Sequence, residues 1–209
     1  MNKRPDLLAG EDLPPSPAQK RSLEKRRRLK AAALALFGEK GYEGASIEEM
    51  AKRAQLASGG FYLHYRSKRQ LLLVLMDELL EAMSRLELRP AGATGVRSGL
   101  RQVLARGLAG DLKYLGAYRA FREAALSDPD LARKEARIHA WTTSRVLGVL
   151  HALERAPGSR KNVDIPTLAR ALDCFFWALL GRVTRMSRVE RERWVDTATD
   201  LVYHAMFHA

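Results

Sequence analysis

The stretch that decides the fold runs from residue 46 to residue 65 and reads SIEEMAKRAQLASGGFYLHY. It opens with Ser46, and Glu49 follows three positions later, which is the pattern of a capping box at a helix start. Behind this start lies an apolar stripe with helical spacing, only two turns long. The stripe consists of Ile47, Met50, Ala51 and Ala54.

A second short helix is expected to follow after a tight break at residues 55–57. Ser58 can cap this helix, which we expect to run to about Tyr65. Phe61 and Tyr65 are four positions apart, so both should face the core together with Leu56. Two short helices joined by a tight turn are typical of a helix-turn-helix.

The flanking sequence predicts a helix on each side of this pair. The preceding one carries Leu29, Ala32, Ala33, Leu36 and Phe37 on one face, and Gly38 and Gly41 should close it. The following one opens with a capping box over residues 67–70 and should run from residue 68 to about 86. It is apolar almost all round from residue 71 to 76, which suits a helix between two domains.

The remainder also reads as helix, so the fold class is all-α with about nine helices. Residues 89–92 break the fourth helix and are expected to form a linker. Helices are then predicted over about 96–108, 112–125, 129–154, 165–184 and 188–207, with Asp128, Asp164 and Ser187 at three of the starts. The expected buried face of the last helix consists of Trp194, Ala198, Leu201, Val202 and Ala205.

Composition narrows the class of partner. The net charge is +12, and residues 1–70 carry 15 Lys and Arg against 8 Asp and Glu, which implies an anionic partner, either nucleic acid or an acidic membrane surface. The single cysteine excludes an internal disulfide and favours a reducing cytoplasm. No apolar run reaches the length of a signal peptide or a membrane span, so we expect a soluble protein without a membrane partner.

In a helix-turn-helix the second helix of the pair lies in the major groove of DNA. Here Ser58, Gly59, Tyr62 and Leu63 should point outward, with His64 at the rim. Gly59 and Gly60 each cost roughly 1 kcal/mol against Ala in a helix, and a bare backbone that approaches DNA closely is a reason to tolerate that cost.

Phosphate contacts are expected beside this helix. The start of the helix at residue 68 presents free amides and Lys68, a natural seat for a phosphate. The cluster at residues 25–28, with Lys25 and Arg28 as candidates, either contacts phosphates or only keeps a helix surface solvated.

At this point the residues resemble those of the TetR-type (TetR/AcrR-like) transcriptional regulators. The resemblance covers about residues 24–75 and is specific, because many positions agree in spacing together. The matching positions are residues 33–37, Gly41, Tyr42, Ser46, Ile47, Met50, Ala51, Ala54, residues 58–62, Tyr65, Ser67, Lys68 and Leu71.

The resemblance implies roles for particular residues. Tyr62 and His64 occupy positions where the family contacts DNA backbone or base edges, and Lys68 a position that grips a phosphate. Further groove-facing or DNA-contacting positions are Ser58, Gly59, Gly60, Leu63 and Ser46. One departure is Gln55, since the family usually has glycine in the turn and a left-handed Gln costs about 1–2 kcal/mol.

The resemblance also implies a domain plan and partners. We expect a disordered arm over residues 1–19, a DNA-binding domain over 20–67 and a helical ligand-binding and dimerisation domain over 68–209, with helix 68–86 connecting the two. Members usually dimerise through their last two helices, here about 165–184 and 188–207. Each binds a small molecule that releases a palindromic operator.

A ligand cavity in the C-terminal part would draw on aromatic residues, although ordinary core packing explains at least half of them. Arg145 falls on the same stripe as Trp141, and an inward arginine would need a carboxylate from the protein or from an anionic ligand. The candidates are Tyr114, Tyr118, Trp141, Arg145, Phe175 and Phe176.

Two other functions stay open at this point. A non-specific architectural nucleic-acid binder would share the basic charge, and a steep salt dependence on every sequence would identify it. An enzyme is disfavoured because no catalytic motif is present. No cofactor is expected, and no metal site either, because His204 and His208 share a helix face without a third ligand.

Overall fold

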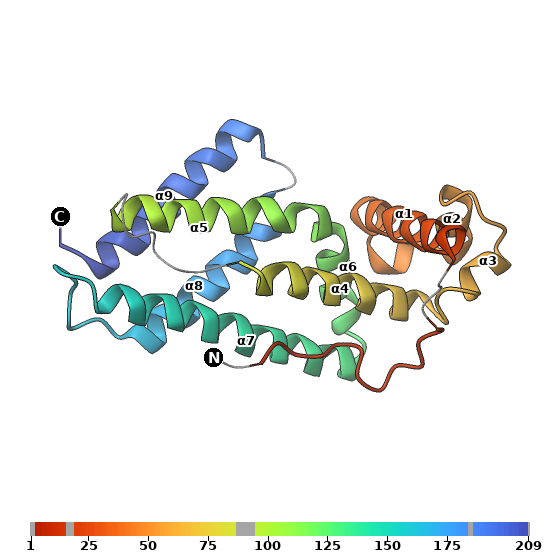
Figure 1. Ribbon diagram of the computed structural model, residues 1–209, viewed down its shortest axis with the longest axis horizontal. Coiled ribbons are helices and arrows are strands. Elements are labelled where there is room, and N and C mark those ends of the chain that lie inside the picture. Colours follow the sequence, from red (N-terminus) through yellow and green to blue (C-terminus); the bar gives the residue numbers. More distant parts are fainter. Residues whose placement is uncertain (1–2, 16–18, 87–94, 184–185, 209) are drawn as a thin grey trace. The chain divides into compact units, whose positions relative to one another are not determined.

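A computed structural model describes residues 3–15, 19–86, 95–183 and 186–208. The described residues form α-helices, one short 3-10 helix and one isolated bridge, with no strand (Figure 1). The bounds are α1 Lys20–Gly44, α2 Ile47–Arg53, α3 Gly59–Tyr62, α4 Lys68–Ser84, α5 Val96–Asp111, η1 Leu112–Tyr114, α6 Leu115–Ala125, α7 Pro129–Glu154, α8 Ile165–Leu180 and α9 Arg188–Met206. None of these helices combines the length and the apolar composition that a bilayer crossing needs.

The chain divides into two compact units, and the division differs from the expected one. The first unit holds Asp6–Glu81 and Lys113–Glu135, and the second holds Met1–Pro5, Ala82–Leu112 and Ala136–Ala209. The first unit thus includes α6 and most of α4 besides the three N-terminal helices, because their buried faces complete its core. The expected linker at residues 89–92 lies outside the described residues.

In the first unit, α1 packs closely against α6. All five residues of the stripe predicted on α1 are buried. Gly116 of α6 meets Gly38 of α1, and a Cβ on Gly116 would lie 2.5 Å from the carbonyl oxygen of Leu34. The prediction that Gly38 closes the helix is wrong, because Gly38 serves this contact inside α1, and the backbone kinks only at Gly41, where φ is 74°.

The N-terminal half of α4 supplies the centre of the first unit. Residues 71–76 are all buried, as their apolar sequence predicts. Burial of this kind contributes roughly 1.5–3 kcal/mol for each large apolar side chain. The core thereby fixes the start of α4 next to the short helix α3.

The second unit is built from α5, the rest of α7, α8 and α9. Figure 1 shows α5 beside α9, and a core cluster joins all four helices and the chain end. Of the face predicted on α9, Ala198 and Val202 are buried, but the prediction is wrong for Leu201, which is 56% exposed. The buried residues of α9 are Val195, Ala198, Thr199, Val202 and Met206.

Candidate nucleic-acid interface and ligand cavity

The short helix α3 presents an exposed face on an anchored base. Phe61 and Tyr65 are fully buried, as predicted, and hold the helix to the core. Tyr62 is 50% exposed and Leu63 is 75% exposed, while an added Cβ on Gly59 would meet no atom within 4 Å. Tyr62 and Leu63 are neighbours in the sequence and both exposed, so this face of α3 is a candidate contact surface.

The turn before α3 adopts the conformation that the sequence argument anticipated for Gln55. Its φ is 57°, the left-handed region that glycine tolerates best. Arg28 of α1 donates from Nη1 to Oε1 of Gln55 at 3.0 Å. This hydrogen bond offsets part of the backbone strain and ties α1 to the turn, a structural task that the phosphate prediction for Arg28 did not foresee.

The two predicted caps of this motif fare differently. Ser46 caps α2 in a full capping box, with its Oγ accepting from the Glu49 amide at 3.2 Å. Ser58 makes no side-chain cap hydrogen bond, so that prediction is wrong. The hydroxyl of Ser58 therefore remains at the surface, where the residue is exposed.

His64 is not at the rim of the surface. It is 5% exposed, because α3 ends at Tyr62 and the chain turns inward after Leu63. Burial lowers the pKa of His64, and the nearby charges of Arg26 and Lys25 lower it further. The rim position expected for His64 is wrong.

Lys68 is the first residue of α4. Its Nζ donates to the carbonyl oxygen of Tyr42 at 2.6 Å and sits 4.3 Å from the centre of the Tyr42 ring. The expected capping box at this helix start forms only in part. Ser67 Oγ accepts from the backbone amide of Gln70 at 3.1 Å. The side-chain oxygen of Gln70, however, accepts from the backbone amide of Arg66 and not from that of Ser67.

The Tyr42 turn is in turn held by a residue that sequence reasoning missed. Glu123 of α6 accepts from the amides of Tyr42 at 2.8 Å and Glu43 at 3.1 Å. Hydrogen bonds from the Glu43 and Tyr42 amides lower the pKa of Glu123. Gly41 is required here, since its φ is positive and a Cβ would lie 2.3 Å from Glu123 Oε2.

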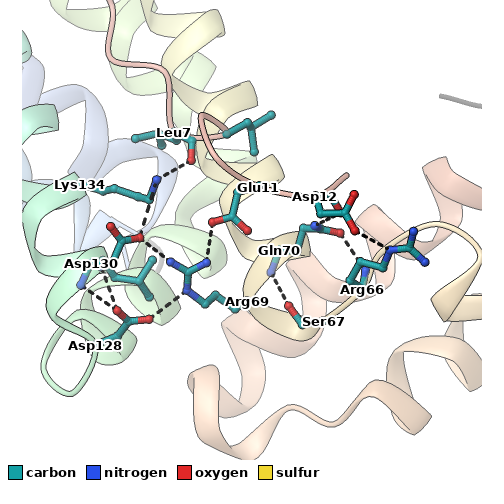
Figure 2. A network of polar contacts seen from close by, with 12 residues as sticks. Leu7, Glu11, Asp12, Arg66, Ser67, Arg69, Gln70, Asp128, Asp130 and Lys134 are labelled. Carbon is teal, nitrogen blue, oxygen red and sulfur yellow. Dashed lines mark hydrogen bonds and ion pairs between the residues drawn. The ribbon is translucent and has the colours of Figure 1, made fainter. Parts of the chain in front are cut away.

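The expectation of a disordered arm is wrong for residues 6–15. Figure 2 shows this segment laid against α4 and the start of α7. Leu7 is fully buried, and its carbonyl oxygen accepts from Lys134 Nζ at 3.0 Å. Gln70 donates from Nε2 to the Asp12 carbonyl oxygen at 2.9 Å. Side-chain and backbone bonds of this kind order a segment whose composition alone suggests disorder.

Arg69 is the centre of the polar network in Figure 2. Its guanidinium pairs with Glu11 at 2.6 Å, Asp128 at 3.0 Å and Asp130 at 2.5 Å. The planar fork of arginine suits several carboxylates at once. The network joins the arm, α4 and the start of α7. The exposed Arg66 is a further basic residue that the sequence analysis did not single out, and its Nε lies 3.6 Å from Oδ2 of Asp12.

Two basic side chains of α1 lie near the residues that follow α3. Lys25 is exposed on α1, and Arg26 donates to the Tyr65 hydroxyl at 3.2 Å while lying over the Tyr65 ring. Arginine over an aromatic ring holds its position without losing its charge. Cations near an exposed helix face can contact phosphates while the face itself meets base edges.

A separate cavity of about 200 Å³ lies within the second unit, and its lining is almost wholly apolar. Phe175, Phe176 and Arg145 line it, as the sequence argument expected. Tyr114 and Tyr118 do not, because both are buried in the first unit. Trp141 is buried beneath the Arg145 guanidinium, which lies 5.1 Å from its ring centre.

Arg145 has protein partners that differ from the expected carboxylate. Its Nη2 donates to the carbonyl oxygens of Met83 at 3.0 Å and Leu86 at 2.9 Å, at and just beyond the end of α4. The last carbonyls of a helix lack partners within the helix, so a cation there satisfies them. Burial lowers the pKa of Arg145. The need for a carboxylate partner at Arg145 is therefore removed.

Comparisons with known proteins agree with this geometry. Residues 29–75 match the family described as bacterial regulatory proteins, tetR family. The HTH-type transcriptional regulator TcmR of Streptomyces glaucescens is 31% identical over 103 residues, which cover 47% of this chain and 46% of TcmR. The A-factor receptor protein of Streptomyces griseus is 37% identical over 60 residues, which cover 29% of this chain and 22% of that protein.

Solved structures extend the likeness of fold to most of the chain. A putative TetR-family regulator from Mesorhizobium loti has a TM-score of 0.62 and 24% identity, with 90% of this chain and 100% of that chain covered. The ketosteroid regulator KstR2 of Mycobacterium tuberculosis has a TM-score of 0.66 and 17% identity, covering 88% and 96%. The chain spans about a fifth to about half of the length of these curated relatives.

Proposed function

Since this chain is a TetR-type transcriptional regulator, we propose that it is a repressor that binds a palindromic operator as a homodimer and leaves it when a small molecule binds. The observation that carries the proposal is the exposed face of α3. Tyr62, Leu63 and the bare backbone at Gly59 stand outward there, while Phe61 and Tyr65 are buried. We place the protein in the cytoplasm and assign it no enzymatic activity.

The operator contact follows from the shape and charge of this surface. Only a narrow helix face fits the major groove, and the absence of a side chain at Gly59 allows close approach. Lys25, Arg66 and Lys68 are the candidate phosphate contacts around it. Lys68 has three donors, so it can hold the Tyr42 carbonyl and a phosphate together.

Dimerisation through α8 and α9 is supported by their exposed apolar residues. Val189 and Leu201 of α9 are 58% and 56% exposed, and Cys174 of α8 is exposed as well. Two copies that pair through these helices form a closed two-fold dimer with two recognition helices. A palindromic operator is the matching DNA symmetry.

Release by a ligand requires that the ligand and the operator favour different conformations. The cavity of the second unit provides a site, and Arg145 on its wall binds the carbonyl oxygens of Met83 and Leu86. Helix α4 begins at Lys68 and ends beside these carbonyls. A ligand that displaces Arg145 therefore acts on the helix whose first residue contacts DNA in this proposal.

Selection of bound fragments from random DNA tests the proposal most broadly. We expect a recovered palindrome whose two half-sites are each contacted by one protomer. Recovery of fragments with no common sequence, together with the same salt dependence on all of them, would instead identify a non-specific architectural binder. A single half-site without symmetry would contradict the dimer.

A further inference from the structure

One carboxylate on the wall of the cavity has an unused acceptor. Asp173 of α8 is 3% exposed and lines the cavity. Its Oδ2 lies 3.1 Å from Nδ1 of His139 on α7. Its Oδ1 is buried and has no hydrogen-bond partner among the residues that the structure describes.

Two other polar side chains on the cavity wall are already engaged. Thr142 donates from Oγ1 to backbone carbonyls of α7 and accepts from Nε1 of Trp177 at 3.3 Å. Arg145 donates to the Met83 and Leu86 carbonyls and stacks on Trp141. Asp173 is thus the residue of this wall with an acceptor that no described protein group satisfies, and Oδ1 becomes available to a ligand when the carboxylate turns toward the cavity.

A buried acceptor of this kind selects for a donor. A buried carboxylate without a compensating partner is unfavourable, and a charged N–H donor compensates it better than a neutral one. The apolar lining around Asp173 suits a hydrocarbon or aromatic body. A ligand that satisfies both surfaces has one cationic donor on an otherwise apolar frame.

We propose that the effector of this cavity is a hydrophobic amine, which binds protonated with its ammonium group on the carboxylate of Asp173, turned toward the cavity, and its apolar part among Phe175, Phe176 and the neighbouring aliphatic side chains. This inference rests on the proposed function for the role of the cavity. It replaces the anionic ligand that the sequence suggested through Arg145, because that guanidinium is occupied and a second carboxylate would lie against Asp173.

The test is a matched series of ligands titrated into the full-length protein by calorimetry. Octylamine, octanol and octanoate share one tail and differ only in the head group. We expect octylamine to bind at least about tenfold more tightly than octanol, with octanoate weakest. The net charge of +12 favours octanoate on purely global grounds, so this order reports the local carboxylate. An octylamine affinity no higher than that of octanol or octanoate overturns the proposal.

Substitutions assign the effect to the residue. Asp173→Asn should lower octylamine affinity about tenfold or more and change octanol affinity less than about twofold. Retained octanol binding shows that the cavity of the variant is intact, and the series on the unaltered protein decides the matter if the variant does not fold. Asp196→Asn is the matched control, because Asp196 pairs with Arg101 outside the cavity. An unchanged octylamine affinity in a folded Asp173→Asn protein also overturns the proposal.

The proposed function can fail separately. Retention of the selected operator is measured in the same samples by fluorescence anisotropy. Amine-selective binding that leaves the operator bound supports the inference and contradicts ligand-controlled release. Release of the operator by octanol as readily as by octylamine supports ligand-controlled release and contradicts the inference of an amine effector.

Discussion

Gly59 has both a structural cost and a role at the proposed DNA surface. A methyl group on it meets no atom within 4 Å, so Gly59→Ala should stabilise the fold by about 0.5–1 kcal/mol through helix propensity. The same methyl group would stand between α3 and the groove. We therefore expect weaker operator binding from a more stable protein, measured by urea unfolding and fluorescence anisotropy.

The matched control for this substitution lies in the second unit. Gly148 of α7 also has no atom within 4 Å of an added Cβ, so Gly148→Ala should stabilise without weakening DNA binding. If Gly59→Ala binds the operator as tightly as the unaltered protein, Gly59 does not face the groove.

Lys68 is expected to contribute charge rather than sequence preference. Lys68→Ala should lower the affinity for operator DNA and for random DNA about equally. It should also flatten the slope of log K against log salt by roughly one. Binding titrations over a range of salt on both DNAs measure this. Lys161→Ala, at an exposed lysine of the second unit, should leave the slope unchanged. An unaltered slope for Lys68→Ala would remove Lys68 from the phosphate contacts.

At the scale of elements, Arg69 holds the arm, α4 and α7 together. Arg69→Met should destabilise the protein by about 2–3 kcal/mol, because it leaves Glu11, Asp128 and Asp130 close together without their cation. Residues 6–15 should then exchange amide hydrogens faster and become sensitive to protease. Hydrogen exchange by mass spectrometry measures the faster exchange, and limited proteolysis measures the protease sensitivity.

The control for the Arg69 substitution is an arginine that shares one of its partners. Arg133 lies 3.4 Å from Asp130, with its side chain 71% exposed, so Arg133→Met should cost less than about 0.5 kcal/mol. An equal decrease in the free energy of unfolding in the two variants would mean that partial burial does not strengthen the ion pairs of Arg69.

The elements that sequence predicted well are those defined by local spacing. The stripe of α1, the cap at Ser46 and the apolar run of α4 were confirmed because each depends on residues within a few turns. The prediction that the arm is disordered failed, because the order of residues 6–15 depends on Arg69, Gln70 and Lys134. These residues are 58 to 127 positions away from their partners in the arm. No local pattern carries such pairings.

The candidate site divides in the same way. The outward positions of α3 follow from helical spacing, whereas His64 is buried because the helix ends after Tyr62. The cavity could not be predicted from the sequence, because its walls come from helices that are far apart along the chain. Tyr114 and Tyr118 belong to the other unit, and the buried oxygen of Asp173 has no signature in the sequence.

At the scale of the whole molecule, the proposed dimer places the exposed apolar residues of α9 at an interface. Leu201→Glu should shift the protein to a monomer, because burial of an unpaired carboxylate opposes association. Sedimentation velocity measures this shift, and operator affinity should fall with it because one protomer reaches one half-site only. Leu126→Glu is the control, since Leu126 is 89% exposed in the first unit. A Leu201→Glu dimer as tight as the unaltered one would place the interface elsewhere.

The central claim, that the exposed face of α3 enters the major groove, is tested most directly by affinity cleavage. Leu63→Cys in a Cys174→Ser background gives a single thiol for an iron chelate that cuts nearby DNA. We expect cuts within the major groove of both half-sites of the selected operator, at positions related by its two-fold axis. The same chelate on Leu126→Cys serves as the reference. Cuts from position 63 that are absent, unsymmetrical or no stronger than those from position 126 would contradict the claim.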